Sequence, residues 1–214
     1  KPVDLSPQTF KNVIKKFEGP IKQLPPVYSA LKHRGVPLYK LARRGNPMQK
    51  PSRCVQIYNI NIQEIALPFI RFEVTCSAGT YIRTLCADIG KSLGCGGHLS
   101  ALKRLESSGF TLNRAISLSE LEKLRNSTKL SEHIICMTDA LPDMPQFRAD
   151  TQLAEKIRHG KMISTRDLTG TYGTAGTDNT GSEIKIVDWD GDLIAILKYS
   201  EPGHRLAYCC VFPK

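Results

Sequence analysis

The sequence predicts an α+β fold, because segments with the two-residue period of a strand and segments with the longer period of a helix both occur along it. Residues 69–76 alternate apolar and polar side chains, as a half-buried strand does. Residues 80–93 carry apolar side chains at helical spacing. Residues 184–199 are two apolar runs around Asp190-Gly191, which favours a β-hairpin. These periods do not give the order of the strands.

The first predicted helix begins after Ser6, a residue type that caps helices, with Pro7 at its first position. Gly19-Pro20 should end it. Its apolar residues are spaced for burial on one face: Phe10, Val13, Ile14 and Phe17.

A stiff loop is predicted next, because Pro25-Pro26 removes two amide donors and holds the chain extended. This loop presents Tyr28, which has the properties needed to stack on an extruded base, although a tyrosine in such a place more often packs against the protein. Residues 38–44 predict a short helix with cations toward its end, closed by Gly45.

A long strand is predicted for residues 55–65, with a bulge near residues 58–60 where the apolar parity shifts. We expect it to pair antiparallel with residues 69–76. The helix that follows should end at the glycines of residues 94–97.

Tyr81 and Arg83 fall in the first turn after the end of a strand. Because they are two residues apart on a helix, their side chains point in different directions, and one could line a pocket wall while the other reaches its floor. The alternative is that Arg83 is a solvated surface cation and Tyr81 a rim aromatic.

The second half of the chain predicts shorter elements and one loop. Ser117 to Glu120 has the sequence of a capping box and should begin a helix. The remaining elements are a strand at residues 98–106, helices at 131–141 and 150–159, a loop at 166–183 rich in Gly, Thr and Ser, the hairpin, and a last strand at 206–212.

The net charge of +10 is unevenly distributed. Residues 1–110 hold 17 Lys and Arg against 6 Asp and Glu, whereas residues 111–214 hold 13 against 14. An excess of cations in one half favours a polyanionic partner such as nucleic acid. A basic face that only aids solubility is the alternative.

The seven cysteines form no Cys-x-x-Cys pair, which argues against a disulfide framework. Cys95 with His98 could be half of a metal site, but no second pair stands at ligand spacing, so we expect no metal. No apolar run approaches the ~20 residues of a membrane span and no signal peptide is visible. A cytoplasmic protein without a membrane partner is expected.

Three blocks of sequence closely resemble the bacterial tRNA pseudouridine synthase B family, in the same order and spacing. The first block is residues 23–32, Gln-Leu-Pro-Pro-Val-Tyr-Ser-Ala-Leu-Lys, with Gly35 and residues 38–45 after it. The second and third are residues 76–85, Cys-Ser-Ala-Gly-Thr-Tyr-Ile-Arg-Thr-Leu, and residues 94–99, Gly-Cys-Gly-Gly-His-Leu.

The resemblance implies a pseudouridine-synthase fold, with a mixed, mainly antiparallel sheet and packed helices, followed by a small PUA-like β domain. We expect residues 1–144 to be the C-terminal part of the catalytic domain and residues 145–214 to be the PUA-like RNA-binding domain. The resemblance also implies that an N-terminal part is missing.

The activity that the resemblance implies is isomerisation of uridine 55 in the TΨC arm of tRNA to pseudouridine. In the family this reaction breaks the N1 glycosidic bond, rotates the uracil and rejoins it through C5, after the base leaves its stack. It uses no cofactor and no metal. The expected partner is the TΨC stem-loop of tRNA, bound by a monomer that needs no guide RNA.

Carried over by position, Arg83 resembles the cation that pairs with the catalytic aspartate, and Tyr28 the aromatic that packs on the target base and assists proton removal at C5. Tyr81 resembles a pocket tyrosine near the nucleotide, and Leu102 an apolar wall of the uracil pocket. Three further cations are expected to contact phosphate, with surface solubility as the alternative: Lys32, Arg43 and Arg44.

The family's catalytic aspartate lies in a Gly-x-Leu-Asp segment that these 214 residues do not contain. Asp4, Asp88 and Asp139 do not stand in that context. The chain alone is therefore expected to be inactive, and an RNA-binding module without catalysis is the alternative function. A cysteine-dependent enzyme that uses Cys76 or Cys95 is a third possibility, and a guide-RNA-dependent relative a fourth that the bacterial motifs disfavour.

Overall fold

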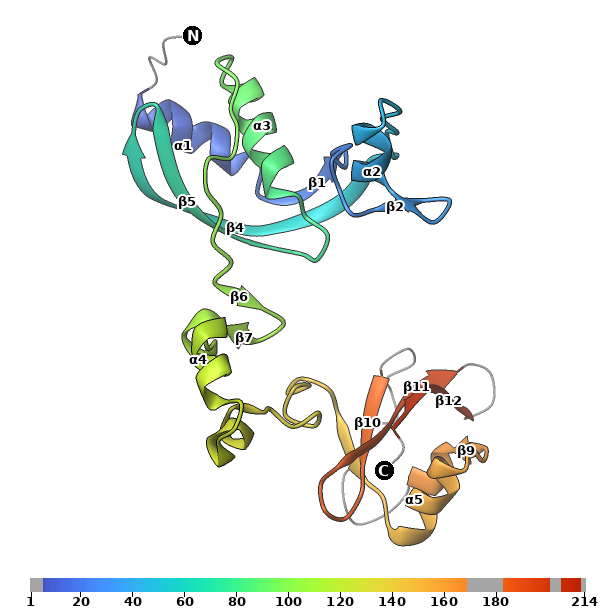
Figure 1. Cartoon of the computed structure of the whole chain (residues 1–214). Helices are drawn as coiled ribbons and strands as arrows, with labels where there is room; N and C mark the ends of the chain where they lie inside the picture. The colour runs from blue at the N-terminus through green and yellow to red at the C-terminus, as the bar shows by residue number, and fades with distance from the viewer. Residues whose placement is uncertain (1–5, 169–182, 201–204, 213–214) are drawn as a thin grey trace. The chain divides into compact units, whose positions relative to one another are not determined.

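The computed structural model describes residues 6–168, 183–200 and 205–212 (Figure 1). The chain divides into two compact units, Lys1–Leu112 and Asn113–Lys214. Each contains helices and β-sheet, so the predicted α+β class is confirmed. The predicted domain boundary after residue 144 stays a prediction.

The first unit is built on a three-stranded antiparallel sheet with the order β1-β4-β5. Register shifts between Ile57 and Asn59 and between Ile62 and Glu64 break the β4–β5 ladder, and the first is the predicted bulge. The elements are α1 (Pro7–Lys15), β1 (Gly19–Gln23), β2 (Lys32–His33), β3 (Val36–Pro37), α2 (Leu38–Arg43), β4 (Arg53–Ala66), β5 (Phe69–Cys76), α3 (Ile82–Ser92), β6 (Glu106–Ser107) and β7 (Phe110–Thr111).

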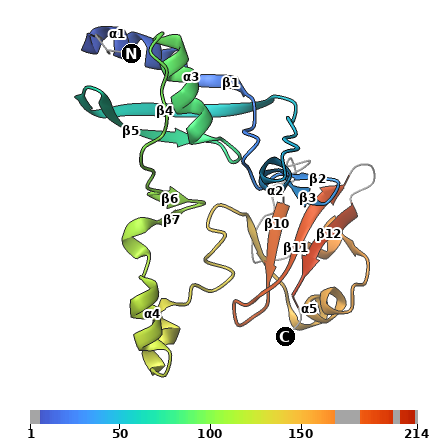
Figure 2. The same cartoon turned by 45° about the horizontal axis from the view of Figure 1, so that its top comes forward.

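Helices α1 and α3 lie against the same face of this sheet (Figures 1 and 2). The alternation of β5 turns one set of its side chains toward them, as predicted. The buried side chains of this core are Phe10, Ile14, Ile57, Ile60, Leu85 and Ile89. This core holds the β5–α3 junction against the sheet.

Helix α3 is packed directly onto the backbone of the glycine loop that follows it. A Cβ atom on Gly90 would lie 2.3 Å from the carbonyl carbon of Gly96 and 2.3 Å from the amide nitrogen of Gly97. A Cβ on Gly97 would lie 2.8 Å from the carbonyl oxygen of Cys86. Only glycine therefore allows this approach.

The second unit contains a five-stranded sheet with the order β8-β10-β11-β12-β9. β8 is parallel to β10, and the other pairs are antiparallel. The elements are η1 (Leu112–Arg114), α4 (Leu118–Leu124), η2 (Thr128–His133), β8 (Gln146–Arg148), α5 (Thr151–Arg158), β9 (Ile163–Ser164), η3 (Thr165–Leu168), β10 (Glu183–Val187), β11 (Leu193–Ser200) and β12 (Arg205–Val211).

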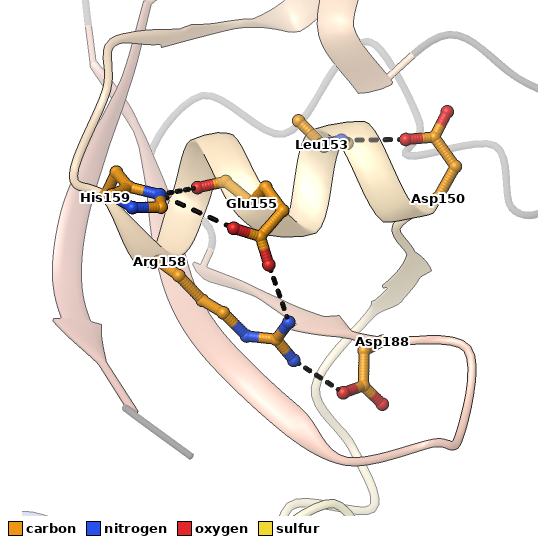
Figure 3. Close-up of polar contacts among 6 residues, drawn as sticks. All are labelled: Asp150, Leu153, Glu155, Arg158, His159 and Asp188. Carbon is orange, nitrogen blue, oxygen red and sulfur yellow. Dashed lines mark hydrogen bonds and ion pairs between the residues drawn. The ribbon is translucent and has the colours of Figure 1, made fainter.

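Charged side chains tie helix α5 to the turn of the β10–β11 hairpin (Figure 3). Asp150 caps the helix by accepting a hydrogen bond from the amide of Leu153 at 2.8 Å. Near its end, Arg158 forms an ion pair with the buried Asp188 at 2.9 Å. Asp188 also accepts hydrogen bonds from the amides of Asp190 and Asp192, so a buried carboxylate is satisfied and shapes the turn.

Two predicted elements are wrong. Residues 98–105 form no regular strand, and only Glu106–Ser107 pairs, with β7. The helix predicted for residues 131–141 is replaced by the 3₁₀ helix η2 and by turns. Most of the predicted loop at 166–183 lies outside the described residues, and its start is the 3₁₀ helix η3.

The close approach at Gly90 predicts that Gly90→Ala lowers the free energy of unfolding by about 1–3 kcal/mol. Alanine is intrinsically favoured over glycine in a helix by about 1 kcal/mol. A lower free energy of unfolding in Gly90→Ala would therefore show that the clash with the glycine loop outweighs this helix propensity. Urea denaturation measures it. Ala87→Gly, on the exposed face of α3, is the matched control for helix propensity. A stabilised Gly90→Ala variant would contradict the packing.

The carboxylate of Asp167 predicts a pH-dependent contribution to stability. Hydrogen bonds from the amide of Ser164, then from Lys156 and the Ser164 hydroxyl, lower its pKa from 3.8 to about 2. The stabilisation is present above the unfolded pKa and is lost as the pH falls toward about 2.

Asp167→Asn should therefore unfold at lower urea concentration than the parent near neutral pH, and this difference should shrink between about pH 4 and about pH 2. Urea denaturation across that range measures it. Asp143→Asn, at an exposed position, is the control. A difference that stays constant with pH would count against the Asp167 contacts.

Candidate active site

The candidate site is centred on the turn between β5 and α3, where the sequence changes from strand to helix. Ser77 is fixed to β4 by two hydrogen bonds: its amide donates to the carbonyl of Gln56 at 2.8 Å, and its Oγ accepts from the amide of Gln56 at 3.0 Å. The hydroxyl of Thr80 donates to the carbonyl of Ser77 at 2.8 Å. The turn is therefore rigid where Tyr81 begins the helix.

Gln23, the last residue of β1, holds the backbone of Tyr81. Its side chain has no exposed surface. Its Oε1 accepts a hydrogen bond from the amide of Tyr81 at 2.9 Å, and its Nε2 donates to the carbonyl of Tyr81 at 3.2 Å. Because Tyr81 is the N-cap of α3, its amide has no partner within the helix, and Gln23 supplies one.

Arg53, the first residue of β4, holds the ring of Tyr81. Its guanidinium carbon lies 5.1 Å from the ring centroid, within the range of a cation–π contact. Its Nη2 donates a hydrogen bond to the carbonyl of Gly79. Gly79 has φ +80°, a conformation that favours glycine, and a Cβ there would also lie 3.2 Å from the Arg53 guanidinium.

Arg83 brings the Tyr28 loop to the start of α3. Its Nη2 donates a hydrogen bond to the backbone carbonyl of Tyr28 at 2.6 Å, across 55 residues of sequence. The side chain of Tyr28 is 52% exposed and is free to meet a ligand. The carbonyl of Pro25, earlier in the loop, accepts from Gln49 Nε2 at 2.7 Å, which fixes the other side of the loop.

Three of the seven predicted site residues are therefore close together: Tyr28 and Arg83 are hydrogen bonded, and Tyr81 is two residues from Arg83. Leu102 is 64% exposed in the irregular segment between α3 and β6, and is not buried against them. The predicted phosphate contacts Lys32, Arg43 and Arg44 are exposed on β2 and at the end of α2.

Sequence reasoning missed Gln23 and Arg53. Gln23 stands in the first of the three motif blocks, but a glutamine beside a proline pair carries no signal of its own role. Arg53 precedes an apolar strand and looks like an ordinary cation. The missing information was the strand pairing, because the two residues are register partners in the β1–β4 pair.

The thiols of the site region serve packing. Cys76 packs against the core of the first unit, and burial raises the pKa of Cys86. Cys95 points its Sγ at the carbonyl of Gly96, 3.3 Å away. The contacts of Cys76 with apolar core side chains and of Cys95 with a backbone carbonyl give no support to the cysteine-dependent enzyme.

Within residues 6–168, 183–200 and 205–212, no group of three or more His, Cys, Asp or Glu side chains is arranged to hold a metal ion. The same residues contain no helix that is long and apolar enough to cross a membrane.

Two family models match the chain. One is described as TruB family pseudouridylate synthase (N terminal domain) and matches residues 1–82. The other is described as tRNA pseudouridylate synthase B C-terminal domain and matches residues 83–142.

Among curated proteins, the chain is similar to tRNA pseudouridine synthase B of Geobacter sulfurreducens, with 38% identity over 90% of this chain and 62% of that protein. The protein of the same name from Syntrophus aciditrophicus is 38% identical over 92% of this chain and 63% of its own length. The enzyme of Francisella tularensis subsp. novicida is 46% identical over 60% of this chain and 42% of its length. The chain thus spans less than two thirds of the length of these relatives.

Solved structures share the fold. A chain of the "Crystal Structure of a Cbf5-Nop10-Gar1 Complex" matches with a TM-score of 0.74 and 24% identity, over 98% of this chain and 63% of that chain. A chain of the "Structure of H/ACA RNP bound to a substrate RNA containing 2'-deoxyuridine" matches with a TM-score of 0.74 and 23% identity, over 99% and 63%. At this identity the likeness concerns the fold alone.

Proposed function

Because the chain belongs to the TruB family of pseudouridylate synthases, we propose that it is part of a tRNA pseudouridine synthase that converts uridine 55 of the TΨC arm to pseudouridine. The observation that carries this proposal is the hydrogen bond from Arg83 to the carbonyl of Tyr28. It joins two of the family-like motifs, and the residue whose carbonyl it binds has an exposed side chain.

The proposed reaction is an isomerisation. The bond between the ribose C1′ and N1 breaks, a bond between C1′ and C5 forms, C5 loses a proton and N1 gains one. Tyr28 would stack on the extruded uracil and assist removal of the C5 proton. Base extrusion costs a few kcal/mol, and stacking on an aromatic ring is worth about 1–3 kcal/mol per base, so the two are of comparable size.

Arg83 is proposed to hold the catalytic aspartate ionised, because an opposite charge within ~4–6 Å favours the charged form of a carboxylate. A guanidinium presents five N–H donors in a fixed fork, so the group that bonds Tyr28 can also receive a carboxylate. We place that aspartate in a Gly-x-Leu-Asp segment outside residues 1–214, and the chain alone is proposed to lack turnover.

The excess of 17 cations over 6 anions in residues 1–110 supports tRNA as the partner. The exposed Lys32, Arg43 and Arg44 are proposed to contact its phosphates. Leu102 is proposed to line the uracil pocket of the complete enzyme, and residues 145–214 to form a PUA-like RNA-binding domain. We further propose a cytoplasmic monomer that acts without a guide RNA.

The same charge distribution favours a second candidate function, an RNA-binding module without catalysis. Binding needs only the cations and the exposed aromatic side chain that the chain contains, whereas turnover also needs the aspartate.

The test is binding and pseudouridine formation on an unmodified TΨC stem-loop. We expect this chain to bind the RNA without converting it. In a longer chain that also contains the Gly-x-Leu-Asp segment, Arg83→Ala should lower turnover by about a hundredfold or more and change the dissociation constant much less.

Arg71→Ala is the matched control, because Arg71 is an exposed cation on β5 whose loss changes the charge equally. Turnover retained by Arg83→Ala would contradict the role of Arg83. Conversion by residues 1–214 alone would show that the aspartate is misplaced, and absence of binding would contradict both candidate functions.

A further inference from the structure

Two residues without a role in the proposed reaction contact Tyr81 from the neighbouring strands β1 and β4. Gln23 and Arg53 face each other as register partners at the last position of β1 and the first of β4. Both contact Tyr81, which is 58 residues from one and 28 from the other along the sequence.

Gln23 acts on the backbone. Its carboxamide has zero exposure and is bonded through both its donor and its acceptor to one residue, Tyr81. The carbonyl of Tyr81 also accepts the first hydrogen bond of α3, from the amide of Leu85 at 3.0 Å. A buried amide that bonds both the N–H and the C=O of one residue fixes the direction in which α3 leaves the turn.

Arg53 acts on the ring. Its Nε is buried and has no hydrogen-bond partner among the residues that the structure describes. The guanidinium is instead held by the carbonyl of Gly79 and by the face of the Tyr81 ring. An aromatic ring has two faces, and a cation on one of them leaves the other for a stacking partner.

We propose that Gln23 and Arg53 are positioning residues that fix the backbone and the ring of Tyr81, so that one face of the ring is presented to an unpaired pyrimidine base of RNA. The RNA part of this inference rests on the proposed function. The positioning part does not, since it is a property of the free chain. Arg83 follows Tyr81 by two residues and donates a hydrogen bond to the Tyr28 loop. The contacts that fix Tyr81 therefore also set the distance between Tyr81 and Tyr28.

The positioning is tested by ¹⁹F NMR after the seven tyrosines of the chain are replaced by 3-fluorotyrosine. Tyr81→Phe assigns the Tyr81 resonance. Gln23→Leu and Arg53→Met should each move it and leave the resonances of Tyr199 and Tyr208, in the second unit, unchanged. Gln63→Leu and Arg71→Met, at exposed positions of β4 and β5, are the matched controls and should not move it.

Unchanged Tyr81 resonances in both variants would overturn the inference. If Gln23→Leu fails to fold, Gln23→Met supplies the same loss of hydrogen bonds with a flexible side chain of similar volume. Arg53→Lys keeps the charge and removes the planar stack, so it should also move the Tyr81 resonance.

The functional part is tested by binding of the unmodified stem-loop in a double-mutant cycle. Arg53→Met should weaken binding roughly tenfold, because stacking on an aromatic side chain is worth about 5- to 150-fold in affinity. In a Tyr81→Ala background the same change should weaken binding by about twofold or less, the effect of one lost cation, which Arg71→Met measures separately.

Equal losses in both backgrounds would show that Arg53 does not act through Tyr81 and would overturn the inference. Failure of the parent chain to bind the stem-loop would instead contradict the proposed function, and the ¹⁹F measurement would still decide whether Gln23 and Arg53 position the ring.

Discussion

The pair of hydrogen bonds between the buried side chain of Gln23 and the backbone of Tyr81 is the constraint on which the candidate site depends. A buried polar group without a partner costs about 1–3 kcal/mol, so the end of β1 and the start of α3 must meet. Arg53 occupies the position opposite Gln23 and closes the same junction over the ring. Arg83 follows on the first turn of α3 and donates a hydrogen bond to the backbone carbonyl of Tyr28, which holds that loop beside the helix. Core packing of α1 and α3 on the sheet supports the junction, and the Gly90–Gly97 contact keeps the end of α3 close to the next loop.

Local patterns predicted most of the elements, because their causes lie within a few residues. Ser117 and Glu120 form the capping box, and residues 69–76 expose and bury alternate side chains. The proximity of Tyr28 and Arg83 was predicted only through a family resemblance, since a hydrogen bond across 55 residues leaves no local pattern. Gln23 and Arg53 were missed for the same reason. The pairing of β8 parallel to β10 likewise depends on a long connection that periodicity does not describe.

Two predicted elements are wrong because a local sequence pattern forms a stable strand or helix only when the rest of the fold supplies a partner strand or buried contacts. A strand was predicted for residues 98–106, but a strand persists only when its amides and carbonyls find a neighbouring strand, and only residues 106–107 do so here. Residues 131–141 are too few to be stable as an isolated helix, and η2 has no buried residue to anchor it. Leu102 lies in the first of these segments, where no regular element orients its side chain.

The central claim is that Gln23 holds the N-cap amide of Tyr81, and hydrogen exchange at that amide tests it most directly. An N-cap amide has no partner within its own helix and ordinarily exchanges fast. We expect the Tyr81 amide to be protected about as strongly as the amides of the β4–β5 ladder, and Gln23→Leu to remove this protection. Exchange of the Tyr81 amide at the unprotected rate, while the β4–β5 amides remain protected, would contradict it.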